Sequence, residues 1–190
     1  MLIKERKNRM IGDIITVKGV KCVVLDEINS NPFVIALDLD IESPFGDSNN
    51  YKKSNLRKRI EAWFEKTGIK AIARDVDLTA MDGYKGYGAL NTVVAPLTFD
   101  EYRKYSHILT PHIKNLFWLV TPWGSPEKDN WASNNVCGVS NDGSANSGTY
   151  NYSRGLAPAF ILDRNQCFNK SLGDYTNEEL IAELNKRLKV

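Results

Sequence analysis

Two helices with clear caps lie between strand-forming runs of this sequence, and that order sets the fold class. Ser54 can cap the first helix, apolar residues recur after it at helical spacing, and Gly68 ends it. Thr98 can cap the second helix, and Pro111 stands just past its end. Strands are predicted over 14–18, 21–26 and 33–39 before the helices, and over 117–120, 135–140 and 159–163 after them. Strands and helices that are segregated along one chain predict an α+β fold.

Length and composition favour a single domain. A chain of 190 residues with 42% apolar and 25% charged residues can bury a sizeable core as one unit, so we expect one domain over 1–190. Residues 1–11 are basic and are predicted to form a mobile arm, and residues 71–95 an irregular connection. Thr176 and Glu179 form a capping box for a C-terminal helix over 176–189.

Cysteine usage and the N-terminus favour the cytoplasm. Cys22, Cys137 and Cys167 are odd in number and lack metal-site spacing, which favours buried thiols in a reducing compartment. No apolar run approaches the ~20 residues of a membrane span, and the N-terminus is charged where a signal peptide would be apolar. We therefore expect a cytoplasmic protein without a membrane partner.

The segment 117–160 has the composition of a recognition surface. Tyr and Trp supply rigid contact area, and Ser, Gly and Asn supply adaptable hydrogen bonds. Trp63 and Trp118 fit core positions, whereas the context of Trp123 and Trp131 leaves loop pinning and ligand contact equally open. The predicted loop surface consists of Trp123, Trp131, Asn134, Asn141, Asp142, Tyr150, Tyr152 and Arg154. Tyr150, Tyr152 and Arg154 are its expected exposed anchors, because Tyr and Arg are common at interface hot spots.

A second candidate surface is basic. Positive charges gather at the start of the first helix, where they oppose the helix dipole. They can neutralise phosphates of DNA or RNA, although a solvated face is the simpler interpretation. This basic patch comprises Lys52, Lys53, Arg57, Lys58 and Arg59.

Catalytic and metal-binding motifs are weak in this sequence. The two histidines, His107 and His112, are separated by the helix-breaking Pro111, and Ser125 lacks a nucleophile elbow. Hydrogen-bonded turns explain the acidic residues better than cation sites do, both at 75–82 and at 141–143. We therefore expect no enzyme activity, no catalytic residues, no metal and no cofactor.

Several motifs together resemble a known family. They are LRKRIEAWFEKTG, DVDLTAMDGYKGYG, PLTFDEYRKY, FWLVTPWGSP, NDGS and GLAPAFIL, between residues 12 and 163. The set is similar to a family of small bacterial and phage proteins with a domain of unknown function, related to the formylglycine-generating-enzyme and C-type-lectin folds. The resemblance implies an antiparallel sheet joining the chain ends, two flanking helices and an irregular, loop-rich lobe that displays a binding surface. Ala157 stands where the family usually has Arg, and Phe117 where it often has Trp.

Two functions follow from these expectations. The first is a non-catalytic protein that binds a protein or nucleoprotein inside a bacterial cell. For a phage-type member of the family, the resemblance implies a counter-defence inhibitor of the anti-CRISPR type, acting on a Cas9-like nuclease or on its DNA binding. The second is a lectin-like adhesin or receptor-binding module that recognises a cell-surface ligand.

Overall fold

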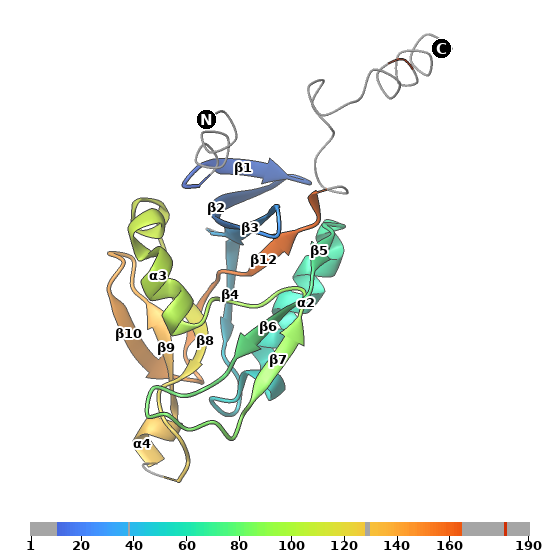
Figure 1. Cartoon of the computed structure of the whole chain (residues 1–190). Helices are drawn as coiled ribbons and strands as arrows, with labels where there is room; N and C mark the ends of the chain where they lie inside the picture. Colours follow the sequence, from blue (N-terminus) through green and yellow to red (C-terminus); the bar gives the residue numbers. More distant parts are fainter. Residues whose placement is uncertain (1–10, 38, 128–129, 165–180, 182–190) are drawn as a thin grey trace.

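The computed structural model describes residues 11–37, 39–127, 130–164 and 181 of the chain. The expected basic arm, Cys167 and the expected C-terminal helix lie outside these residues, apart from Ile11 and Ile181. Within them the chain forms two larger sheets, one small sheet and a few helices, so the predicted α+β class is confirmed (Figure 1).

The first sheet joins strands from both ends of the described core. Its order is β1-β2-β3-β12-β5, and all its pairings are antiparallel. Lys18 and Gly19 both have positive φ and form the tight turn between the first two strands, one residue earlier than the gap at 19–20 between the predicted strands. The strands are β1 (Ile14–Val17), β2 (Val20–Ile28), β3 (Asn31–Ala36), β5 (Ala71–Ile72) and β12 (Ala159–Leu162).

The second sheet contains three strands that the sequence did not predict. Its order is β10-β9-β8-β11-β4, with one parallel contact between β11 and β8. Its strands are β4 (Leu39–Pro44), β8 (Phe117–Pro122), β9 (Asn135–Val139), β10 (Ala145–Thr149) and β11 (Ser153–Leu156), of which β4, β10 and β11 were not predicted. The irregular connection expected over 71–95 is also wrong in part, because β6 (Arg74–Asp77) and β7 (Ala89–Thr92) pair as a third, two-stranded sheet.

Both predicted helices form with the predicted caps. The Ser54 hydroxyl accepts a hydrogen bond from the Arg57 N–H to begin α2 (Asn55–Thr67), and Gly68 ends it in the left-handed region. Thr98 and Glu101 form a complete capping box at the start of α3 (Phe99–Leu109). Short helical segments complete the set: η1 (Tyr51–Lys53), η2 (Thr110–His112) and α4 (Asn130–Ser133).

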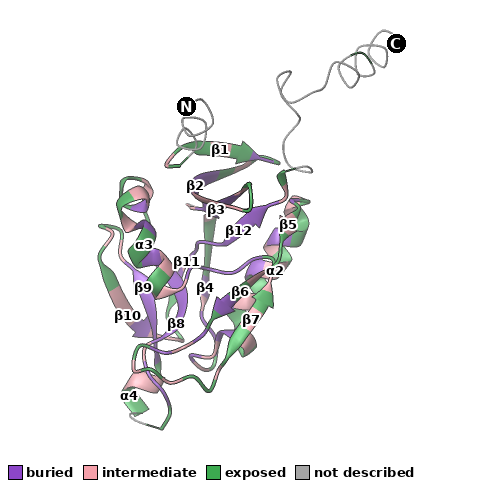
Figure 2. Cartoon of the chain, viewed as in Figure 1, coloured by how far each residue is buried: buried purple, intermediate pink, exposed green. Residues whose placement is uncertain are grey.

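Alternate side chains of the first sheet pack on opposite helices. On β2, Cys22 and Val24 belong to the core cluster that contains α2, whereas Val23 and Leu25 belong to the cluster that contains α3. The strands β3 and β12 divide in the same way, because successive side chains of a strand point to opposite faces. Helices therefore cover both faces of this sheet, and the centres of its strands β2, β3 and β12 are buried (Figure 2).

The predicted core aromatics lie in the first of these clusters. Trp118 is fully buried and packs edge-on against Phe45, and its indole N–H donates to the Ser43 carbonyl. Trp63 packs against the same cluster while remaining partly exposed. Cys22 and Cys137 are buried, and burial raises the pKa of Cys137 to about 12. These two thiols are therefore structural, as predicted.

Candidate binding surface at the loop end

Four chain segments meet at one end of the molecule, which we call the loop end. They are residues 45–50, 78–88, 122–127 with 130–134, and 149–153, gathered around α4 at the bottom of Figure 1. Backbone hydrogen bonds join them: the Gly46 N–H donates to the Tyr150 carbonyl, and the Tyr150 N–H donates to the Asn134 carbonyl. The Met81 N–H donates to the Pro122 carbonyl over 3.0 Å. The loop end is therefore one connected structure rather than separate loops.

Asn49 is the buried centre of the loop end. Its side-chain amide donates to the Gly124 carbonyl over 2.7 Å, and its amide oxygen accepts from the Tyr87 hydroxyl over 2.7 Å. The residue is only 1% exposed. A buried amide that both donates and accepts a hydrogen bond fixes the geometry around it. Breaking either bond would leave a buried polar group without a partner, which costs free energy. Asn49 thus holds three of the four segments in place.

Asp82 makes a second link between loops. One carboxylate oxygen accepts from the Tyr84 N–H over 3.0 Å, and the other accepts from the Ser125 N–H over 2.9 Å. The Tyr84 ring folds over Gly86 and packs edge-on against Tyr87, with ring centroids 5.3 Å apart. The glycine-rich turn is therefore ordered by its own side chains, and the hydrogen-bonded role expected for the acidic residues of 75–82 is confirmed for Asp82.

Large side chains remain exposed on this framework. Tyr152 is 62% exposed, Trp131 is 61% exposed and Met81 is 45% exposed. Asn134 is exposed between Trp131 and Tyr150. Exposed aromatic side chains on a fixed support are typical of binding surfaces. The structure thus brings the predicted surface residues Trp131, Asn134 and Tyr152 together at the loop end.

Two other predicted surface residues lie at the loop end but face inward. Trp123 and Tyr150 are half-buried, and each packs against one of the two core clusters. For Trp123 the structure therefore favours loop pinning. Tyr150 contributes its backbone to the loop end more than its ring, so its prediction as an exposed anchor is only partly correct.

The prediction of Arg154 as an exposed anchor is wrong. Arg154 is 6% exposed, and its guanidinium lies over the Trp118 ring with its central carbon 4.2 Å from the centroid. It donates to the Asn146 side-chain oxygen over 2.6 Å and to the Ser147 carbonyl over 3.1 Å. The indole face and these two neutral acceptors compensate for the water that the Arg154 guanidinium loses on burial. Arg154 is a structural residue.

Asn141 and Asp142 do not belong to the loop end. They form the turn between β9 and β10, at the opposite end of these strands from Asn134 and Tyr150. The Asp142 carboxylate accepts from the Ser144 hydroxyl and N–H, and these bonds lower the pKa of Asp142. The expected hydrogen-bonded turn is confirmed. The prediction that Asn141 and Asp142 belong to one surface with Trp131 is therefore wrong.

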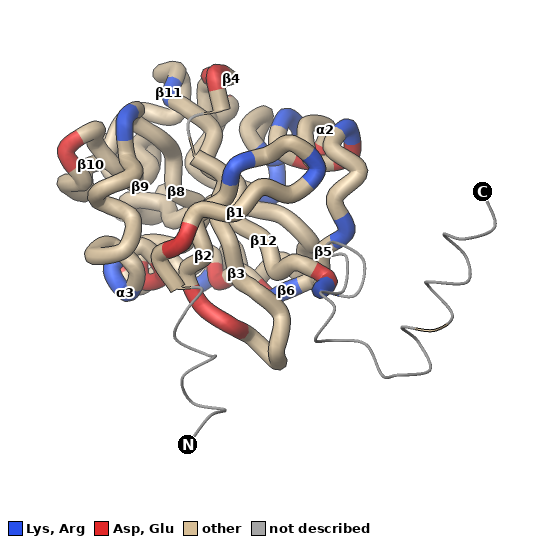
Figure 3. The backbone as a smooth tube through the Cα atoms, turned by 90° about the horizontal axis from the view of Figure 1, so that it is seen from above, with Lys and Arg blue, Asp and Glu red and all other residues tan. Residues whose placement is uncertain are grey.

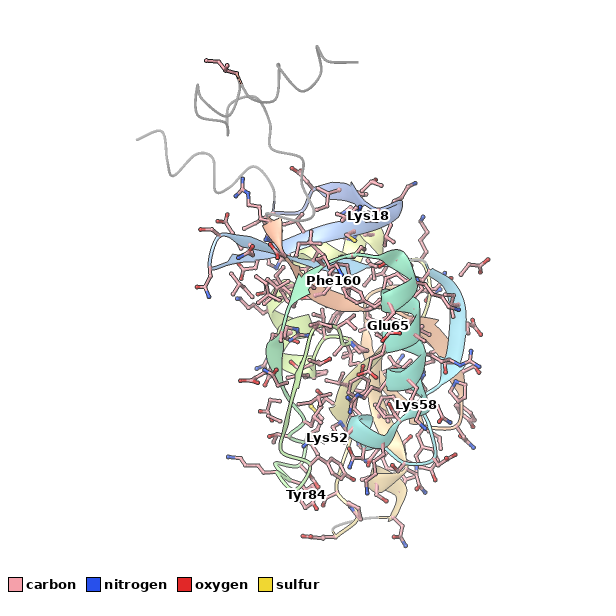
Figure 4. The ribbon with its side chains drawn as sticks, turned by 90° about the vertical axis from the view of Figure 1, so that its right-hand side faces the viewer. Lys18, Lys52, Lys58, Glu65, Tyr84 and Phe160 are labelled. Carbon is pink, nitrogen blue, oxygen red and sulfur yellow. The ribbon has the colours of Figure 1, made fainter. Side chains whose placement is uncertain are left out.

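The basic patch is dispersed around its helix. Arg57 forms an ion pair with Glu61 over 2.8 Å, and Arg59 donates to the Glu42 carbonyl on β4. The Lys52 ammonium lies beside Gly88, which belongs to the loop-end segment 78–88. Lys53 and Lys58 are exposed, and Figure 3 shows acidic segments among the basic ones on α2. Figure 4 places Lys52 near Tyr84 at the loop end and Lys58 further along the helix.

Comparison with known proteins finds no relative of this chain. No family model, curated protein or solved structure matches the chain. The family resemblance therefore stays a prediction.

The described part of the chain contains neither a membrane-spanning helix nor a cluster of metal ligands. There, no helix has the length and apolar character needed to cross a bilayer, and no three His, Cys, Asp or Glu side chains gather as a metal site would require.

Sequence reasoning missed the residues that organise the loop end. Asn49 stands in the polar run DSNN, which has the composition of an ordinary loop, and its partner Tyr87 lies 38 residues away. Tyr84 and Tyr87 fall within the connection that was predicted to be irregular. The available signal was the pairing of tyrosines with glycines in GYKGYG, which is typical of a ring folding over its own turn.

Proposed function

We propose that this protein is a non-catalytic binding protein that contacts a macromolecular partner through its loop end. One observation carries the proposal: buried hydrogen bonds centred on Asn49 fix the loops, while Trp131 and Tyr152 stay more than half exposed. An ordered surface loses little conformational entropy when it binds, so large exposed side chains on it are available for affinity. Apolar side chains of this size are otherwise costly to leave in water.

The proposed partner is a nucleoprotein inside a bacterial cell. The family resemblance points to a Cas9-like nuclease complex, which would make the protein an inhibitor of the anti-CRISPR type. The buried thiols of Cys22 and Cys137 are compatible with a cytoplasmic location. A contact between the basic patch and DNA or RNA is part of the same proposal, because Lys53 and Lys58 remain exposed.

We also propose the C-type-lectin-like and formylglycine-generating-enzyme-like form of the α+β fold. Three features support it. The strand β12 pairs with β3, so both ends of the described core share one sheet. The helices α2 and α3 cover its two faces, and the long loops gather into a separate lobe (Figure 1). Folds of this kind often bind ligands through such loops, and a lectin-like adhesin is therefore the alternative function.

The binding test uses the purified full chain with a Cas9-like nuclease loaded with guide RNA. We expect a measurable dissociation constant and inhibited DNA cleavage. Each of the substitutions Trp131→Ala and Tyr152→Ala should weaken binding by about 30-fold. This corresponds to about 2 kcal/mol, as expected for a hot-spot residue. Ile72→Ala, an exposed apolar residue on β5, is the matched control and should leave binding unchanged.

A glycan array separates the two functions. Binding to glycans that depends on Trp131, together with no binding to the nuclease complex, would contradict the inhibitor function and support the adhesin function.

A further inference from the structure

The loop end has the shape of a projecting wedge. It tapers toward α4 in Figure 1, and it carries Trp131 and Tyr152, the most exposed aromatic side chains of the described residues. Two surface cavities lie elsewhere, along β1, β4 and η2. A projecting surface fits a concave partner, as long recognition loops do when they enter clefts.

The two exposed aromatic residues are held at a fixed spacing. The Trp131 carbonyl accepts from the Asn134 N–H over 3.2 Å and from the Asn135 side chain over 2.6 Å. The Asn134 carbonyl accepts from the Tyr150 N–H, and the Tyr152 N–H donates to the Thr149 carbonyl over 3.0 Å. Trp131 and Tyr152 are thus connected through a short chain of hydrogen bonds. A partner therefore meets both side chains on one fixed backbone arrangement.

Charges of both signs are interspersed on this wedge: Asp47, Lys85 and Glu127 are exposed there, and the Lys52 ammonium lies beside Gly88. The Asp82 carboxylate is bonded to two loop N–H groups, and Arg154 is buried over Trp118. The basic patch lies mainly along α2, where Arg57 is paired with Glu61 and Arg59 is bonded to Glu42. A phosphate-binding surface needs several free cations on one face. This arrangement favours contact with a protein surface instead.

We propose that the loop end inserts Trp131 and Tyr152 into a cleft of a protein partner, without itself contacting nucleic acid. This inference rests on the proposed binding function and specifies its chemistry. The cleft would supply an apolar pocket for the indole and a rim of hydrogen-bonding groups for the exposed Asn134 and the Tyr152 hydroxyl. In a nucleoprotein target, the contact would therefore lie on the protein component.

Site-directed photocrosslinking in living bacteria tests this inference, because the crosslinker captures a partner of any identity. Benzoylphenylalanine replaces Tyr152, Lys53 or Ile72 in the full chain, and bacteria that express each variant are irradiated. We expect a discrete adduct from position 152 that protease removes and nuclease leaves intact. Trp131→Ala should reduce its yield about tenfold or more, in line with loss of a hot-spot residue. Position 72 should give no matching adduct.

Three results would overturn the inference. They are an adduct that nuclease removes, an adduct that forms from position 53 in place of 152, and the absence of any discrete adduct from 152. The charge change Lys53→Glu with Lys58→Glu should lower the yield from 152 less than Trp131→Ala does, with Lys66→Glu as the matched control. Mass spectrometry of the adduct identifies the partner. A protein other than a nuclease would sustain this inference while contradicting the proposed target.

Discussion

Replacing Asn49 by alanine is expected to lower the free energy of unfolding by about 3 kcal/mol, because two buried hydrogen-bonding groups lose their partner. The Tyr87 hydroxyl and the Gly124 carbonyl both bond to this amide, and the site is almost fully closed to water. The loss should also loosen the loops that Asn49 joins. Chemical denaturation measures the stability, and binding to the nuclease complex should weaken in the same variant.

A second substitution separates the two bonds of Asn49. Tyr87→Phe removes only the bond to the amide oxygen, so we expect it to cost about 1 kcal/mol, typical of a single hydrogen bond. Equal costs for Asn49→Ala and for an exposed substitution such as Asn91→Ala would contradict the central role of Asn49 in the loop end.

Replacing Gly148 by alanine is expected to destabilise the fold by about 3 kcal/mol, since it displaces a buried cation from an aromatic face. A methyl group at Gly148 would lie 2.1 Å from one Arg154 guanidinium nitrogen, and its other close neighbours also belong to Arg154. In an Arg154→Ala background the same substitution should cost almost nothing. The double-mutant cycle therefore yields a coupling energy close to the full effect.

Gly138 provides the matched control for this cycle. A methyl group there would clash with Arg154 at 2.0 Å, but it would also lie 2.9 Å from the Phe117 carbonyl of the backbone. Gly138→Ala should therefore remain destabilising after Arg154 is removed. Additive effects of Gly148→Ala and Arg154→Ala in thermal or chemical unfolding would mean that Arg154 is not seated between these two glycines.

Local signals predicted the elements that depend on local chemistry. The caps of α2 and α3 and the pair of strands β1 and β2 are each decided by a few neighbouring residues, so they could be predicted from sequence, with the turn between the strands misplaced by one residue. The strand β10 could not be, because its residues ANSGT have low strand propensity. Pairing with β9 and the room that Gly148 gives to Arg154 set its conformation. These are contacts across the fold.

The candidate site shows the same division. Composition alone named Trp131 and Tyr152 as candidates, because large aromatic residues in a polar loop are unusual, and both side chains are exposed. It failed for Arg154, because an arginine can be buried when an indole face and carbonyl groups replace water. Composition also grouped Asn141 with Trp131 in one surface, because the two residues are close in sequence. They lie at opposite ends of a hairpin, and a strand of five residues is about 17 Å long.

Hydrogen–deuterium exchange of the free protein and of its complex with the nuclease tests the binding role of the loop end most directly. We expect slow exchange at the amides of Met81, Ser125 and Tyr150 in the free protein, because each donates a hydrogen bond between loops. In the complex we expect further protection over 130–134 and 149–153. Protection confined to α2, or fast exchange of these loop amides in the free protein, would contradict a preformed binding surface at the loop end.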